Sequence, residues 1–111
     1  MRNVPTDLLR AFVTVAETQN FTRAGDVLFR TQAAVSMQIR RLEEQLGGAL
    51  FERDSRGTSL TDQGKFLLSY AKRILQLNDE LLESLELGRA TQLIRFGAPT
   101  AQSKIMGNTR R

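Results

Sequence analysis

Two hydrogen-bonding side chains stand one helical turn apart in TQAAVSMQIRRLEEQLG, the stretch of residues 31–47. The amide of Gln32 can make two hydrogen bonds to the edge of an adenine, and the hydroxyl of Ser36 can bond to several bases or to phosphate. Ala33 and Met37 could pack against thymine methyl groups beside them. This chemistry favours a helix start that touches nucleic acid. The alternative is that Gln32 and Ser36 are ordinary exposed polar residues, and their spacing alone does not decide between the two.

Two arginines follow on the same stretch. Arg40 and Arg41 could reach phosphate groups, but they are equally placed to pair with Glu43 and Glu44, three and four residues away. We expect the ion pair for Arg41 and leave both roles open for Arg40.

Three further arginines are candidates for contact with DNA. Arg56 lies beside Gly57 at the tip of a predicted hairpin and could enter a minor groove, where narrow A·T tracts attract arginine. Arg53, at the base of that hairpin, is expected to order it or to touch the DNA backbone. Arg23, early in a predicted helix, could contact phosphate.

Composition excludes several classes of protein. The chain has no Cys and no His, which removes disulfides, thiolate metal sites and the commonest general base. Its carboxylates are scattered over predicted helix surfaces, so we predict neither an enzyme nor a cofactor. No stretch has the roughly 20 apolar residues of a membrane helix, and the first residues lack a secretory signal. A cytoplasmic location is the expectation.

The positive charge is concentrated at one end of the chain. The net charge is +4, yet residues 1–88 hold 11 Lys plus Arg and 12 Asp plus Glu, a net of −1. Residues 89–111 hold five basic residues and no acidic one. An argument for DNA binding by residues 1–88 must therefore rest on where their arginines lie.

Three short helices must position these side chains. Thr6 is predicted to cap the first, which ends near Gln19, and Asn20 to cap the second, which ends near Phe29. Thr31 is predicted to cap the third, and Gly47 to stop it. The third helix has a core face within about 60° of its circumference. That face is formed by Val35, Ile39, Leu42 and Leu46.

A hairpin and a long helix follow. Two extended segments flank the charged turn Asp54–Gly57 and predict a hairpin over residues 50–60. Thr61 is predicted to start a helix that ends at Gly88. Gly64, early in this helix, lowers helix propensity, so we expect a close packing contact there.

The long helix carries an apolar stripe with steps of four and three residues. The stripe consists of Leu67, Ala71, Ile74, Asn78, Leu81 and Leu85. With a second line of leucines beside it, the stripe is wider than one packing seam needs. We predict that it pairs with the same helix of a second copy, with Asn78 setting the register. The alternative is that the helix folds back on its own domain.

A tight turn between the second and third helices, followed by a hairpin, is typical of a winged helix-turn-helix. The chain resembles the N-terminal DNA-binding region of LysR-type transcriptional regulators between about Leu8 and Leu87. The resemblance is carried by LRAFVTVAETQNFTRAGDVL, TQAAVSMQIRRLEEQLGGALFER and RGTSLTDQGKFLLSYAKRIL. It implies a mainly α fold: a winged helix-turn-helix over residues 1–61, then a linker and dimerisation helix over residues 62–88. Residues 89–111 are expected to hold a remnant of the first strand of an effector-binding domain and a disordered basic tail.

The resemblance also implies sequence-specific binding to promoter DNA as a dimer, through the helix at 32–46 and the wing at 50–60. The base-contacting positions of the family fall on Gln32, Ala33, Ser36 and Met37, and its wing arginine on Arg53 or Arg56. Three positions depart from the family pattern. Ala33 replaces a usual proline, Met37 an arginine found in many members, and Gly25 a usual alanine, at a cost in helix propensity of about 1 kcal/mol. The missing arginine predicts a different target sequence or a lower affinity.

Partners follow from the same resemblance. We expect double-stranded DNA, a homodimer through the linker helix and no small-molecule effector, because only LIRFGAPTAQ resembles the effector-binding domain. The alternative is an interaction protein that pairs through its linker helix with a full-length relative and interferes with the oligomers of that relative.

Overall fold

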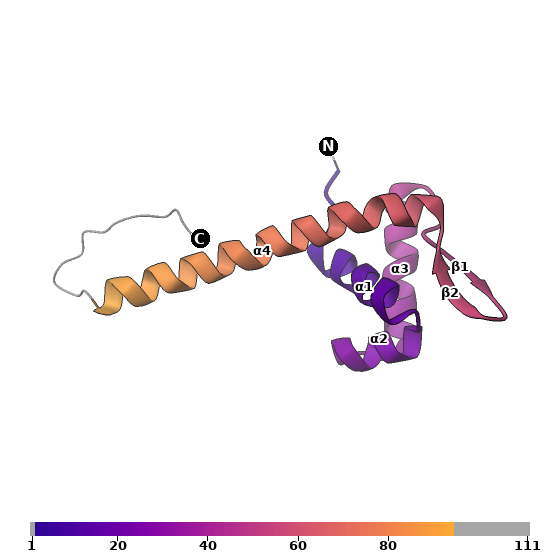
Figure 1. Cartoon of the computed structure of the whole chain (residues 1–111), viewed down its shortest axis with the longest axis horizontal. Coiled ribbons are helices and arrows are strands. Elements are labelled where there is room, and N and C mark those ends of the chain that lie inside the picture. Colours follow the sequence, from indigo (N-terminus) through magenta and orange to yellow (C-terminus); the bar gives the residue numbers. More distant parts are fainter. Residues whose placement is uncertain (1, 95–111) are drawn as a thin grey trace. The chain divides into compact units, whose positions relative to one another are not determined.

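The computed structural model describes the backbone of residues 2–94 and the side chains of residues 2–88. Its elements are α1 (Thr6–Thr18), α2 (Phe21–Leu28), α3 (Gln32–Leu46), β1 (Phe51–Asp54), β2 (Gly57–Leu60) and α4 (Asp62–Ile94) (Figure 1). The predicted class is confirmed: three helices, a small antiparallel hairpin and a long helix. The chain divides into two units, Met1–Leu75 and Gln76–Arg111, and the division falls inside α4.

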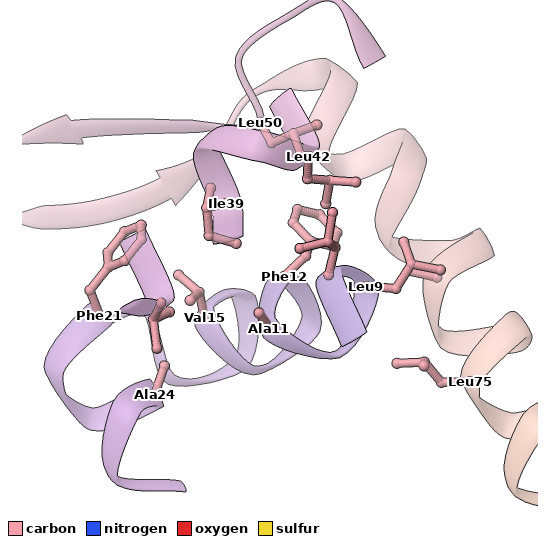
Figure 2. Packing of buried hydrophobic residues seen from close by; sticks show 13 residues of the cluster. Leu9, Ala11, Phe12, Val15, Phe21, Ala24, Ile39, Leu42, Leu50 and Leu75 are labelled. Carbon is pink, nitrogen blue, oxygen red and sulfur yellow. The ribbon is translucent and has the colours of Figure 1, made fainter. Parts of the chain in front are cut away.

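The core of the first unit is built from α1, α2, α3 and the first part of α4. Figure 2 shows Phe12 of α1 close to Leu42 of α3, and both side chains are completely buried. Ala71 and Leu75 of α4 belong to the same hydrophobic cluster. The first unit therefore includes the start of α4, because burial of that segment completes its core.

The caps of the first two helices differ in kind. The prediction that Thr6 caps α1 is wrong. Pro5 occupies the N-cap position without a side-chain hydrogen bond, and its carbonyl accepts from the N–H groups of Leu8 and Leu9, both at 3.2 Å. Proline is favourable at this position because its fixed φ suits the start of a helix. The cap of α2 is confirmed, since the side chain of Asn20 accepts from the Arg23 N–H at 2.8 Å.

The turn between α2 and α3 depends on a glycine and on one left-handed residue. Phe29 has φ 58° and ψ 45°, and the Arg30 N–H donates to the Gly25 carbonyl at 2.8 Å. A Cβ on Gly25 would lie 2.6 Å from the Arg30 carbonyl oxygen. The glycine therefore does more than lower helix propensity, because it lets the turn close against α2.

The hairpin is tied firmly to the start of α4. Phe51 pairs with Leu60 and Asp54 with Gly57, as predicted for a turn at 54–57. The Thr61 N–H donates to the Leu50 carbonyl at 3.0 Å. The Thr61 hydroxyl donates to the Ala49 carbonyl at 2.7 Å and accepts from the Gly64 N–H at 3.0 Å. The helix start predicted at Thr61 is thus confirmed, and Thr61 anchors the base of the wing.

The close contact expected at Gly64 is also confirmed. Gly64 is buried, and a Cβ there would collide with the Leu50 carbonyl oxygen and lie 2.9 Å from Leu60 Cδ2. Only a residue without a side chain lets α4 pack this closely on Leu50, just before β1, and on Leu60 of β2.

The predicted end of the long helix is wrong. α4 continues through Gly88 to Ile94, because one glycine among good helix formers costs only about 1 kcal/mol and does not stop a helix by itself. Leu93 and Ile94, predicted to begin a strand, are helical. The remainder of that strand and the tail, residues 95–111, lie outside the described residues. None of the described helices is long and apolar enough to cross a membrane.

Candidate nucleic-acid interface

The two faces of α3 differ sharply in burial. Val35, Ile39 and Leu42 are buried in the core, and Leu46 packs against its edge, which confirms the predicted core face. The opposite face carries the residues predicted to read DNA. Exposed on it are Thr31, Gln32, Ala33, Met37 and Arg40, while Ser36 is half-buried. The core packing of α3 therefore leaves its first turns open to a ligand.

The two polar side chains of this face are bonded to each other. Gln32 Nε2 donates to Ser36 Oγ at 2.8 Å. The second N–H of the amide, its Oε1 atom and the Ser36 hydroxyl proton remain for other partners. The contact fixes the plane of the amide, which is the property that a bidentate contact with a base edge requires.

Thr31 caps α3 with its side chain, as predicted. Its Oγ1 atom accepts from the Ala34 N–H at 3.0 Å. The hydroxyl proton of this exposed residue remains available as a donor at the helix N-terminus, where the helix dipole favours a phosphate.

The arginines on α3 make no ion pair within the described residues, so the pair predicted for Arg41 is wrong. The Glu43 carboxylate instead accepts from the Leu50 N–H at 2.8 Å. Its partner is backbone because Glu43 lies beside the loop that leads into β1. Arg40 and Arg41 are both exposed, and neither charge is neutralised by a neighbouring carboxylate.

The two wing arginines have different environments. Arg56 lies in the two-residue turn, where its N–H donates to Asp54 Oδ1 at 2.8 Å, and its side chain is exposed. The guanidinium carbon of Arg53 lies 4.2 Å from the centroid of the Phe21 ring. Arg53 thus packs against the first residue of α2.

Two residues at the start of α2 differ in how they compare with the prediction. Arg23 lies in the first turn of α2, exposed, and makes no ion pair within the described part of the chain. Phe21 was not predicted as a site residue. The sequence marks Phe21 only as an apolar residue at a helix start. Its contact with Arg53 joins residues far apart in the sequence, so no local pattern indicates it.

The predicted dimerisation stripe divides between core and surface. Leu67 packs against the core of the first unit, and Ala71 is 0% exposed. Ala71 therefore cannot contact a second copy and is removed from the predicted dimerisation residues, because it packs within its own domain. Ile74, Leu81 and Leu85 are exposed, and Asn78 is half-buried. The first part of the stripe thus packs on its own domain, and most of its later residues remain exposed.

Residues 6–65 match the family model described as "Bacterial regulatory helix-turn-helix protein, lysR family". The chain belongs to the LysR family. Among curated relatives of this LysR-type chain, HTH-type transcriptional regulator DgdR of Burkholderia cepacia is 41% identical over 104 residues, or 94% of this chain and 35% of DgdR. HTH-type transcriptional regulator PecT of Dickeya dadantii is 44% identical over 96 residues, or 86% of this chain and 30% of PecT. The chain therefore spans about a third of the length of these relatives.

Solved LysR-type structures have the same fold. The DNA-binding domain of BenM in complex with benA site 1 DNA superimposes with a TM-score of 0.70 at 40% identity. That match covers 75% of this chain and 96% of the BenM domain. Full-length CbnR complexed with its target DNA superimposes with a TM-score of 0.68 at 36% identity, over 78% of this chain and 29% of CbnR. This LysR-type chain thus shares the winged helix-turn-helix of proteins whose structures contain DNA.

Proposed function

We propose that this LysR-type chain binds double-stranded promoter DNA in the cytoplasm and regulates transcription. In this proposal α3 enters the major groove with Gln32, Ala33 and Ser36 toward the base edges, and the β1–β2 wing lies beside it over the backbone. The BenM domain and CbnR, with DNA in their solved structures, support this assignment.

The observation that carries the proposal is the division of α3 into two faces. One face consists of buried residues, Val35, Ile39 and Leu42. The other begins with short side chains, which allow the helix end to approach the floor of a groove, and with an amide already oriented by Ser36. Met37, 49% exposed, brings a thioether to this face that could pack on a thymine methyl group.

Unpaired cations supply the sequence-independent part of the binding. Arg23, Arg40 and Arg56 are exposed and make no ion pair within the described residues. Phosphate contacts through such side chains release counterions, so affinity should fall steeply as salt rises. The near-neutral net charge of residues 1–88 does not oppose this, because these arginines lie on the elements that would meet the DNA.

We further propose that two copies pair through α4. Leu81 and Leu85 lie on α4 after Leu75, and their apolar side chains are exposed. Burial against an identical helix would remove this surface from water. Pairing with a longer relative would use the same exposed face of α4.

The test is fluorescence anisotropy or gel shift of the 111-residue chain with labelled promoter fragments at two salt concentrations. We expect binding that weakens with salt and prefers some fragments over others. Absence of binding at low salt would contradict the proposal.

Matched charge variants sharpen this test. Arg56→Gln should weaken binding to every fragment and lower the slope of log affinity against log salt by about one unit. Lys72→Gln is the control, because Lys72 Nζ lies 3.7 Å from Glu17 Oε2 and so faces a carboxylate of its own domain. The control should bind DNA like the unchanged protein.

A further inference from the structure

One side-chain contact joins the wing to the helix-turn-helix. The guanidinium of Arg53, on β1, stacks on the ring of Phe21 with 4.2 Å between the guanidinium carbon and the ring centroid. Arg53 is exposed, whereas Phe21 is only 8% exposed. The contact therefore links a surface cation to a buried residue at the start of α2.

Phe21 is in turn held by other aromatic rings. Its ring meets that of Phe51 edge-on, with centroids 5.8 Å apart and planes inclined by 71°. The Phe51 ring lies 5.4 Å from that of Phe12, which is completely buried. Figure 2 shows Phe21 beside the strands of the hairpin and Phe12 deeper in the core. The ring beneath Arg53 is thus a fixed platform rather than a mobile side chain.

We propose that Phe21 is a positioning residue for DNA binding that acts through Arg53. Stacking uses the face of the planar guanidinium and leaves N–H groups at its edge to donate to a phosphate. A stacked arginine also loses less rotamer entropy when it binds than an arginine free in solvent. The inference rests on the proposed DNA binding and adds a residue that need not touch DNA itself.

The first test removes the ring face but keeps an apolar side chain in the core. Phe21→Leu should weaken binding to a mixed-sequence, fluorescein-labelled duplex of about 30 base pairs by about threefold to tenfold at low salt. The salt slope should stay unchanged, because no phosphate contact is lost. Arg53→Gln should bind more weakly still and lower the slope by about one unit.

The second test measures whether the two residues act together. Phe21→Leu with Arg53→Gln should bind no more weakly than Arg53→Gln alone, because the ring has nothing left to position. Phe21→Leu with Arg56→Gln should instead show the two losses added together, because Arg56 does not stack on Phe21. Additive losses for the first pair would overturn the proposal.

Arg53→Lys repeats the test without touching the core. It keeps the charge but lacks a planar group to stack, so its loss of affinity should match that of Phe21→Leu. If Phe21→Leu does not fold, judged by circular dichroism, Arg53→Lys decides alone, and unchanged affinity in that variant overturns the proposal. In the folded protein, ring-current shifts of the Arg53 side-chain protons should be present and should vanish in Phe21→Leu.

Phe51→Leu is the matched control for lost aromatic packing. It removes one ring that supports Phe21 but leaves the Phe21 ring beneath Arg53, so its loss of affinity should be smaller than that of Phe21→Leu, less than about twofold. An equal loss in Phe51→Leu and Phe21→Leu would show that general packing matters, and would overturn the role of Phe21. Failure of the unchanged protein to bind the duplex would instead remove the proposed function.

Discussion

Gln32 and Ser36 form a bonded pair on the exposed face of α3, with 2.8 Å between Gln32 Nε2 and Ser36 Oγ. The pair is pre-organised, because the amide that would contact a base is held by the helix that carries it. An amide fixed before binding loses little side-chain entropy on contact with DNA. The two residues are therefore expected to act as one unit in sequence recognition.

Substitutions that break the Gln32–Ser36 hydrogen bond should weaken the preference for specific bases. Gln32→Ala is expected to cost about 1–3 kcal/mol on the preferred promoter fragment and much less on a mixed-sequence duplex. Ser36→Ala should cost less, since the amide survives but is no longer oriented. Competition binding on the two duplexes measures both effects. Equal losses on both duplexes would argue that the pair contacts only the backbone.

Opposite effects on stability are expected for alanine at two glycines of α4. Gly64→Ala should destabilise the protein by about 1–3 kcal/mol, because the new Cβ collides with the Leu50 carbonyl. Gly88→Ala should stabilise α4 by about 0.5–1 kcal/mol, because a Cβ there has nothing within 4 Å. Urea denaturation followed by circular dichroism at one protein concentration compares them. Stabilisation by Gly64→Ala would show that α4 can move away from the hairpin.

The strained turn before α3 should accept glycine with a gain in stability. Phe29 is 95% exposed and has a positive φ of 58°, so Phe29→Gly removes backbone strain and no buried contact. We expect a gain of about 0.5–1 kcal/mol, smaller than the strain itself because glycine also enlarges the unfolded ensemble. Gln19→Gly, at the other exposed non-glycine residue with positive φ among the described residues, should behave alike. A melting temperature that falls only for Phe29→Gly would indicate that this ring packs in solution.

Pairing through α4 should depend on one face of the helix. Replacement of Leu81 and Leu85 by Glu is expected to convert a dimer to a monomer in sedimentation velocity experiments, because like charges would meet in a desolvated interface. Leu87→Glu is the control, since Leu87 is exposed and lies about 160° around the helix from Leu85. A monomeric unchanged protein, or a dimer that survives the double replacement, would contradict the pairing.

The parts of the fold that were predicted correctly depend on neighbours in the chain. Asn20, Thr31 and Thr61 cap the helices that follow them, because a cap joins a side chain to an N–H group only two or three residues away. The core face of α3 and the turn at 54–57 are similarly local, set by periodicity and by turn residues. The resemblance to LysR-type regulators was carried by these same segments.

The errors come from competition between groups, which a rule applied to one residue at a time does not weigh. Pro5 replaced Thr6 as the cap because the proline carbonyl already serves the first N–H groups. Gly88 did not end α4, because its cost is smaller than the gain from helix formers around it. Glu43 bonded to the Leu50 N–H rather than to Arg41, since a backbone donor was brought close by the loop after α3.

The sequence by itself determined the helices, the wing, the family and the polar first turns of α3, because these follow from periodicity, caps and local motifs. Only the tertiary structure decided that Ala71 is buried within its own domain, that Leu50 is the neighbour for which Gly64 leaves room, and that Arg53 rests on Phe21. Each of these depends on where a distant segment packs. Contacts between residues far apart in the chain are set by the shared core, and no local pattern encodes them.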